Sequence, residues 1–132
     1  MTLKDFREWI KPQIKDLKAC YSGKIDASKE CIIGLYTREG SSNKIAIGGL
    51  ECTSTAHKTI SILVHWNKNY DESEIKAKEI YDLLEKHVCE PTQIGGVDAF
   101  FVLRNDEPIG VGTDDHDIFE FVIDINIKYK RG

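Results

Sequence analysis

The chain has 132 residues, of which 41% are hydrophobic and 30% charged, which predicts one soluble domain spanning residues 1–132. A chain of this size can bury a core that needs no disulfide or metal to hold it together. The net charge of −4 and the pI near 5.6 argue against general or sequence-specific nucleic-acid binding, which needs a basic surface, and no apolar run is long enough to cross a membrane.

The first predicted element is a helix over residues 2–18. Thr2 is its predicted N-cap, with Asp5 three positions later. Pro12 should kink the helix or split it in two, because its ring clashes with the preceding turn. An apolar stripe could dock a partner, but packing against the protein's own sheet is the favoured interpretation. Its members recur at steps of three and four residues: Leu3, Phe6, Ile10, Ile14 and Leu17.

Two strands separated by an irregular stretch are predicted next. A connector at Tyr21–Asp26 leads to Cys31–Tyr36, whose continuous hydrophobicity indicates a central strand. Residues 37–57 are irregular apart from a short strand at Lys44–Ile47, and so long an irregular stretch usually forms an arm or a binding loop. Lys58–Trp66 then alternates apolar residues on one face with mostly polar residues on the other, which predicts a strand.

A second helix is predicted from Asp71 to about Val88, with apolar residues along one side. Asp71 is its predicted N-cap, and Glu74 occupies the reciprocal position of a capping box. A strand of mixed pattern follows at Val97–Leu103. Residues 105–117 are then expected to form a long acidic loop.

The last predicted strand, Ile118–Tyr129, organises the fold. Every second residue from Phe119 to Tyr129 is apolar, and all but one of the residues between them are polar. One face of the sheet should therefore pack on the core, while the other faces water or another subunit. The order of elements predicts an α+β domain, with a largely antiparallel sheet of four to five strands and two helices packed on one face.

Candidate chemistry is sparse. The run from Asp114 to Asp117 is the densest cluster of metal-binding residue types, but it lacks EF-hand spacing, so a solvated turn capped by its own Asp side chains is favoured. The charged first residues lead us to expect no signal peptide and synthesis in a reducing cytoplasm, where isolated cysteines are mostly buried hydrophobes. The sequence thus predicts no catalytic, cofactor-binding or metal-ligating residue. The isolated cysteines are Cys20, Cys31, Cys52 and Cys89.

Three stretches in series resemble a known family. They are Ile47–Ser54, Leu63–Asn69 and Val111–Asp115, the last running into Phe119–Phe121. In this order and at these separations they are similar to the small minor capsid proteins of phages and prophages of Gram-positive bacteria, which belong with the tail terminators of tailed phages. The resemblance covers most of the chain from Tyr21 onward.

The resemblance implies a structural protein rather than an enzyme, acting without a cofactor. Tail terminators assemble as a hexameric ring on the last ring of tail tube protein, stop its growth, and present their other side to the head connector. In contractile tails and headless tail-like bacteriocins, the cap also meets the sheath. The chain is thus expected to be made in the bacterial cytoplasm and assembled into a phage tail or tail-like particle.

Several residues are candidates for these contacts, and two other functions stay open. Residues in polar or irregular stretches are the candidates for contacts with the tail tube or with neighbouring subunits. Acidic residues are the candidates for the wall of the ring's lumen, because walls facing DNA are often acidic. One alternative is a head-completion or connector protein. The other is a small metal-dependent hydrolase, which would require the Asp114–Asp117 run, including His116, to converge on one ion. The interface candidates are Arg38, Lys44, Asp114 and Asp115, and the lumen candidates are Glu120 and Asp124.

Overall fold

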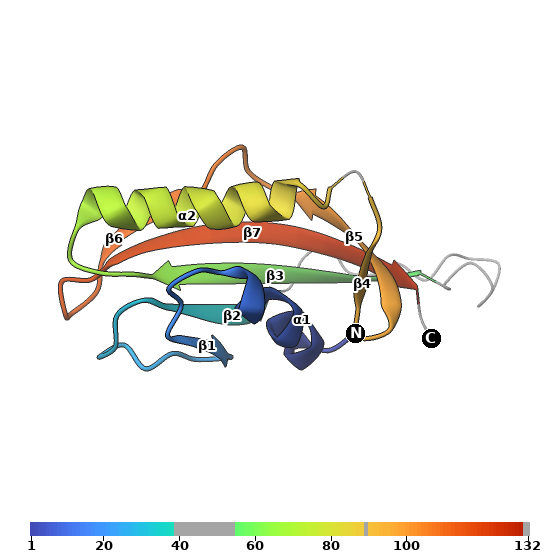
Figure 1. The fold of residues 1–132 in the computed structure, drawn as a ribbon, viewed down its shortest axis with the longest axis horizontal. Coiled ribbons are helices and arrows are strands. Elements are labelled where there is room, and N and C mark those ends of the chain that lie inside the picture. The colour runs from blue at the N-terminus through green and yellow to red at the C-terminus, as the bar shows by residue number, and fades with distance from the viewer. Residues whose placement is uncertain (39–54, 89, 131–132) are drawn as a thin grey trace.

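The computed structural model describes residues 1–38, 55–88 and 90–130, and these form a mixed sheet with two α-helices (Figure 1). The helices are α1 (Leu3–Ile10) and α2 (Tyr70–Glu85), and a 3-10 turn, η1 (Lys11–Gln13), follows α1. The strands are β1 (Ala19–Ser22), β2 (Ile32–Arg38), β3 (Thr55–His65), β4 (Thr92–Ile94), β5 (Val97–Leu103), β6 (Ile109–Thr113) and β7 (Phe119–Lys130).

The α+β class is confirmed, but the predicted sheet of four to five largely antiparallel strands is wrong. The described residues form a sheet of seven strands in the order β1-β2-β3-β7-β5-β4, with β6 beside β7, and β1 pairs with β2 in parallel. The three missed strands are three to five residues long: β1 overlaps the start of the predicted connector, β4 precedes the predicted strand at Val97–Leu103, and β6 lies in the predicted acidic loop. Strands this short cannot show an alternating pattern.

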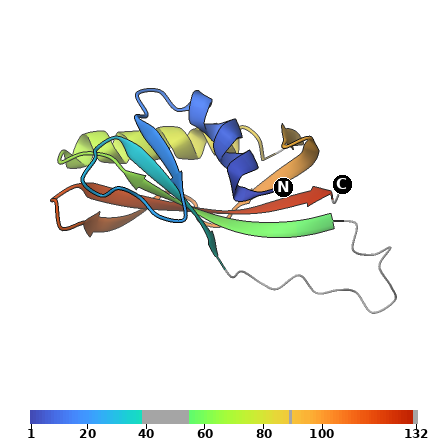
Figure 2. The same ribbon diagram turned by 90° about the horizontal axis from the view of Figure 1, so that it is seen from below.

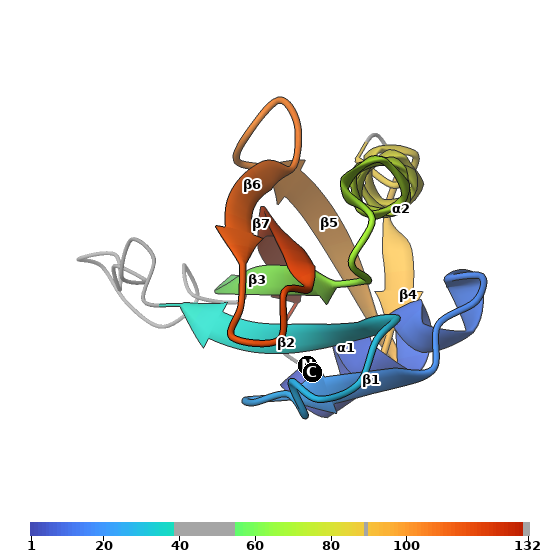
Figure 3. The same cartoon turned by 90° about the vertical axis from the view of Figure 1, so that its left-hand side faces the viewer.

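Strand β7 lies at the middle of the sheet, as its pattern predicted (Figures 1 and 3). One edge pairs antiparallel with β3 from Thr55↔Lys130 to His65↔Glu120. The other edge pairs first with β6 and then with β5, so two separate strands share it. Apolar residues of β3 and β7 stand opposite one another on one face, as in the pair Ile62↔Ile123.

Both helices pack on that apolar face, which confirms the predicted layering (Figure 2). The buried cluster joins residues of the helices to residues of β2, β3, β5 and β7, and burying them supplies most of the driving force for folding. No helix in the described part of the chain has the length and hydrophobicity that a bilayer crossing needs. The cluster includes Phe6, Ile10, Leu35, Ile60, Ile62, Ala77, Ile80, Leu84, Phe101, Ile123, Ile125 and Ile127.

Helix α1 begins as predicted and ends early. The Thr2 hydroxyl accepts a hydrogen bond from the Asp5 amide at 3.2 Å, and the Asp5 carboxylate accepts one from the Thr2 amide at 2.8 Å. These bonds hold the pKa of Asp5 below its usual range. The predicted helix over 2–18 is wrong beyond Ile10, because Pro12 cannot sit inside an α-helix and the chain tightens into the 3-10 turn instead.

The N-cap of helix α2 lies two residues before the predicted one. Asn69 is the N-cap, and its side-chain oxygen accepts a hydrogen bond from the Glu72 amide at 3.1 Å, so the predicted capping box of Asp71 and Glu74 is wrong. The Asn67 side chain accepts a hydrogen bond from the Asn69 amide at 2.9 Å and fixes the preceding turn. The helix ends at Glu85 rather than near Val88.

The predicted strands at Cys31–Tyr36 and Lys58–Trp66 correspond to β2 and β3, which extend further than expected into the irregular stretch. Strand β2 runs to Arg38 and β3 begins at Thr55. The rest of that stretch, with the short strand expected at Lys44–Ile47, lies outside the described residues.

Two cysteines can be compared with the prediction of buried thiols. Cys20 and Cys31 are free and half-buried. Burial raises the pKa of the Cys20 thiol to about 11 and also raises the pKa of Cys31. Both therefore stay protonated and unreactive near neutral pH. Cys52 and Cys89 lie outside the described residues.

Candidate functional site

The face of the sheet opposite the helices, which we call the open face, carries hydrogen-bonded pairs across β3 and β7. The Ser61 hydroxyl donates to the Asp124 carboxylate at 2.5 Å, and the Thr59 hydroxyl donates to the Asn126 side-chain oxygen at 2.8 Å. Both pairs follow from the β3–β7 register, which places these residues directly opposite one another. These pairs form a row of polar side chains along the open face. Ser61 and Asp124 are buried within the chain itself, without any partner protein.

His65 ends this row at the last residue of β3. Its ring is completely buried, and Nδ1 lies 2.9 Å from Oε2 of Glu120, the residue opposite it on β7. The other ring nitrogen, Nε2, lies 3.1 Å from the Ala27 carbonyl oxygen and 3.6 Å from Oδ2 of Asp114. With both nitrogens engaged and no exposure, His65 is placed to hold segments together rather than to take a proton from a substrate.

Asp114 lies in the turn between β6 and β7, and its side chain stabilises this turn by hydrogen bonds. Oδ1 accepts hydrogen bonds from the His116 amide at 2.9 Å and the Ile118 amide at 3.1 Å. Burial alone would raise the pKa of Asp114, but the amides of Ile118 and His116 and the nearby His65 ring outweigh it and leave the pKa below its usual range. Its Oδ2 is buried without a hydrogen-bond partner among the described residues.

The structure brings together a different metal-binding set from the one considered in the sequence. His65, Asp114 and Glu120 offer ligand atoms that all lie within 4.8 Å of one another, and this is the one such group among the described residues. Asp115, beside Asp114 in the same turn, is exposed. His65 and Glu120 face each other only because of the β3–β7 register, so local spacing carried no signal for this group.

The remaining predicted interface residues are placed as follows. Arg38 ends β2 and pairs through its backbone with Thr59, but nothing is described of its side chain. Lys44 lies outside the described residues. Of the two lumen candidates on the open face, Glu120 has 17% of its side chain exposed and Asp124 is buried. Both carboxylates have partners within the chain, His65 and Ser61.

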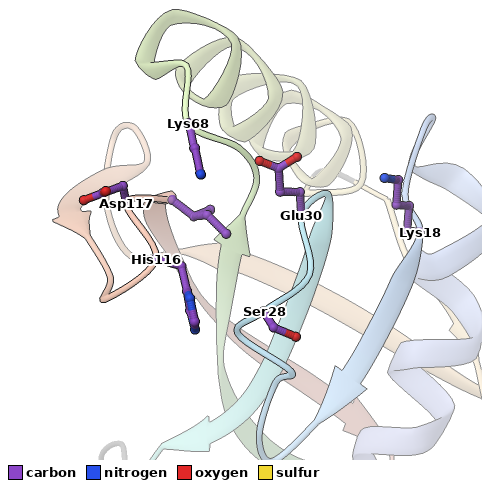
Figure 4. Close-up of a pocket in the computed structure, with 7 residues that line it drawn as sticks. Lys18, Ser28, Glu30, Lys68, His116 and Asp117 are labelled. Carbon is purple, nitrogen blue, oxygen red and sulfur yellow. The ribbon is translucent and has the colours of Figure 1, made fainter.

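An open hollow of about 460 Å³ lies against the turn that follows Asp114 (Figure 4). Ser28, from the segment between β1 and β2, and His116, from the β6–β7 turn, line it from opposite sides. Charges of both signs surround it, so it shows no preference for one kind of small ion. Its lining residues are Lys18, Ser28, Glu30, Lys68, His116, Asp117 and Ile118.

Three apolar side chains on the open face are exposed to solvent. Phe100 and Val102 of β5 stand opposite Lys128 and Asn126 of β7, and their residues are 42% and 45% exposed. Ile109 of β6, opposite Val122, is 43% exposed. Sequence reasoning missed this feature because it took the open face to be polar from the patterns of β3 and β7, whereas these apolar residues lie on β5 and β6.

Comparison with known proteins identifies a family. The model of a protein family described as bacteriophage tail terminator protein matches residues 10–131, nearly the whole chain. No curated protein and no solved structure matches. The match supports the resemblance seen in the sequence and covers every strand of the sheet.

Proposed function

Because the chain belongs to the bacteriophage tail terminator family, we propose that it caps the end of a tail tube as a ring of six identical subunits. The cap stops growth of the tube and forms the surface that joins the head connector or, in a contractile tail, the sheath. The family match over residues 10–131 is the observation that carries this proposal. A role in building the particle needs no catalytic site.

The exposed apolar residues of the open face support assembly with further copies of this chain. An exposed apolar surface beside polar residues is typical of protein–protein interaction sites. We propose that Phe100, Val102 and Ile109 pack against a different surface of the next subunit. Such a head-to-tail contact closes into a ring when its rotation fits a whole number of subunits.

The lumen and tube contacts predicted from the sequence remain part of the proposal. Glu120 and Asp124 would act on passing DNA through their negative field rather than by direct contact, since both have partners within the chain. We further propose that Arg38, Lys44 and the turn carrying Asp114 and Asp115 meet the tube or a neighbouring subunit.

Tail length in assembled particles tests this function. Tails made with and without the protein should be measured by negative-stain electron microscopy. Overlong tubes of variable length in its absence are expected for a terminator. Tails of normal length that fail to join heads would instead assign the chain to the connector, and unchanged, fully joined particles would contradict both roles.

A substitution on the open face tests the proposed subunit contact. Phe100→Ser with Val102→Ser should leave the isolated protein folded, because both residues are about half-exposed, but should give overlong tails. Ile75→Ser is the matched control, because Ile75 is 60% exposed on α2, which covers the opposite face of the sheet. Normal tails with the double variant would show that this patch is not a subunit contact. Chemical cross-linking of purified tails should yield multimers of the chain up to six.

A further inference from the structure

Three polar atoms from distant parts of the chain converge at one end of the sheet. They are Nε2 of His65, Oδ2 of Asp114 and the carbonyl oxygen of Ala27. The two oxygens lie 3.6 Å and 3.1 Å from Nε2. Ligands bound to one metal ion at about 2.0–2.2 Å lie roughly 3–3.5 Å apart, so this spacing is close to that of a coordination sphere.

Each of these atoms is held in place by its own local structure. The Asp26 side chain accepts hydrogen bonds from the amide and hydroxyl of Ser28, at 3.2 Å and 2.6 Å, and so fixes the turn that presents the Ala27 carbonyl. The two amide bonds to Oδ1 fix the carboxylate of Asp114. His65 is the last residue of a strand paired on both sides.

Glu120 sets the tautomer of His65. Its Oε2 lies 2.9 Å from Nδ1, and because an ionised carboxylate only accepts hydrogen bonds, Nδ1 is the donor. In the neutral ring the lone pair then lies on Nε2, the nitrogen close to Asp114 and Ala27. Histidines that bind metals usually donate their second ring N–H to a carboxylate in this way, which orients the ring and makes it a better ligand.

A proton on Nε2 accounts for less of this geometry than a cation does. A protonated Nε2 would donate a hydrogen bond to the Ala27 carbonyl oxygen, 3.1 Å away. The Oδ2 atom of Asp114, 3.6 Å from Nε2, would then have no hydrogen bond. That oxygen is buried and has no hydrogen-bond partner among the described residues. Leaving a buried carboxylate oxygen unpaired is costly, whereas a cation would bind all three atoms at once.

We propose that His65, Asp114 and the Ala27 carbonyl bind a divalent transition-metal ion of the Zn²⁺ class, with Glu120 as the outer partner of the histidine. One nitrogen and two oxygen donors suit such an ion better than Mg²⁺ or Ca²⁺, which prefer oxygen ligands throughout. The carboxylates of Asp114 and Glu120 together balance its charge. Ser28 and His116, close neighbours of Ala27 and Asp114 in sequence, line the open hollow, and in this proposal a water molecule from the hollow completes the coordination.

The ion would join the segment between β1 and β2 to the β6–β7 turn, two parts of the chain that are far apart in sequence. Its role is structural, because His65 is completely buried. The site does not depend on tail capping, and metal binding by the isolated protein tests it separately.

Calorimetric titration of the full chain with ZnCl₂, after treatment with EDTA and dialysis, is the direct test. One equivalent should bind and raise the midpoint of thermal unfolding. Asp114→Asn keeps an oxygen for the amides of His116 and Ile118 but loses the second carboxylate oxygen, so it should weaken binding at least tenfold. Glu120→Gln should weaken it about 10–100-fold, as loss of an outer partner usually does.

Two controls separate this site from other ways of binding zinc. Asp115→Asn removes the same charge from an exposed neighbour and should leave the affinity unchanged. The Co²⁺ complex should show an absorption spectrum of nitrogen and oxygen ligands, because thiolate bands would mean that cysteines hold the metal. The proposal is wrong if no Zn²⁺ binds, if cysteines bind it, or if Asp114→Asn binds it as tightly as the unaltered chain.

Discussion

A β-carbon added at Gly95 would lie 2.7 Å from Cγ of Asp5, so the turn between β4 and β5 closes directly on the capping box of α1. Gly95 has a φ of +60°, a conformation that favours glycine. The turn thus approaches the start of α1 at a position that lacks a side chain. The contact joins the first helix to the far edge of the sheet.

Substitutions at two adjacent glycines separate this contact from backbone strain. Gly96 also has a positive φ, of +82°, but a β-carbon there would meet nothing within 4 Å. We expect Gly96→Ala to lower the free energy of unfolding by about 1–2 kcal/mol, the cost of a left-handed conformation. Gly95→Ala should cost about 1–2 kcal/mol more, because Asp5 must move and the capping box breaks. Urea unfolding measures both, and equal costs would show that the Asp5 contact is unimportant.

The buried hydrogen bond from Ser61 to Asp124 should contribute more to stability than its neutral neighbour. Ser61→Ala removes a donor to a carboxylate, and we expect a loss of about 1.5–3 kcal/mol in the free energy of unfolding. Thr59→Val removes the equivalent bond to Asn126, and about 0.5–1.5 kcal/mol is expected for a bond between neutral groups. Chemical denaturation tests the order of the two losses. The reverse order would mean that Asp124 draws its stabilisation from other groups.

Lys76 should be the lysine of α2 whose loss is most costly. Its Nζ donates to the Lys15 carbonyl at 3.0 Å, pairs with Glu79 at 2.8 Å and lies 5.1 Å from the centroid of the Trp66 ring. We expect Lys76→Met to cost about 1–3 kcal/mol, because the residue is buried and the carbonyl loses its donor.

Lys78 supplies the control for that substitution. Its Nζ lies 3.7 Å from Asp82, and 68% of the Lys78 side chain is exposed. Lys78→Met should therefore cost less than about 0.5 kcal/mol. Thermal unfolding of both variants measures the difference, and similar midpoints would contradict the role assigned to Lys76.

Cys20 should react slowly with alkylating reagents in the folded protein. Burial raises its pKa from 9.0 to about 11, so its thiolate fraction at pH 8 is about one-hundredth of that of an ordinary thiol. Site-specific mass spectrometry after iodoacetamide treatment should show alkylation at least about a hundredfold slower than in guanidinium chloride. Comparable rates in the two states would contradict the inferred burial.

The same shift has a consequence for stability at alkaline pH. The folded state holds the proton of Cys20 more tightly than the unfolded state does, so this contribution is complete below about pH 9 and is lost as the pH rises toward 11. Cys20→Ala should flatten the decline of the unfolding midpoint over that range. An unchanged slope would assign the decline to other groups.

The sequence predicted those parts of the fold that show a long periodic pattern. Strands β3 and β7 have 11 and 12 residues, enough for alternation to identify both of them and the face that each buries. The start of α1 was predicted because Thr2 and Asp5 form a local capping box. Strand β6, with the sequence Ile-Gly-Val-Gly-Thr, was predicted as a loop because its glycines are typical of turns.

The polar cluster around His65 could not be predicted because it depends on register and on loop geometry. Glu120 meets His65 through the pairing of two strands, and 55 residues separate them in sequence. Ala27 contributes only its backbone carbonyl, and a backbone group leaves no mark in a sequence. Asp114 was singled out with its sequence neighbours, whereas its partner in space is His65.

The position of β7 has a consequence for synthesis on the ribosome. Strands β3, β5 and β6 all pair with β7, which is the last of the seven to be made. Until it emerges, β3 has one edge without a partner and the apolar faces of the other strands have no central strand to join them. Partly made chains therefore expose the strand edges on which aggregation begins. The sheet can be completed only after synthesis has passed Tyr129, near the end of β7.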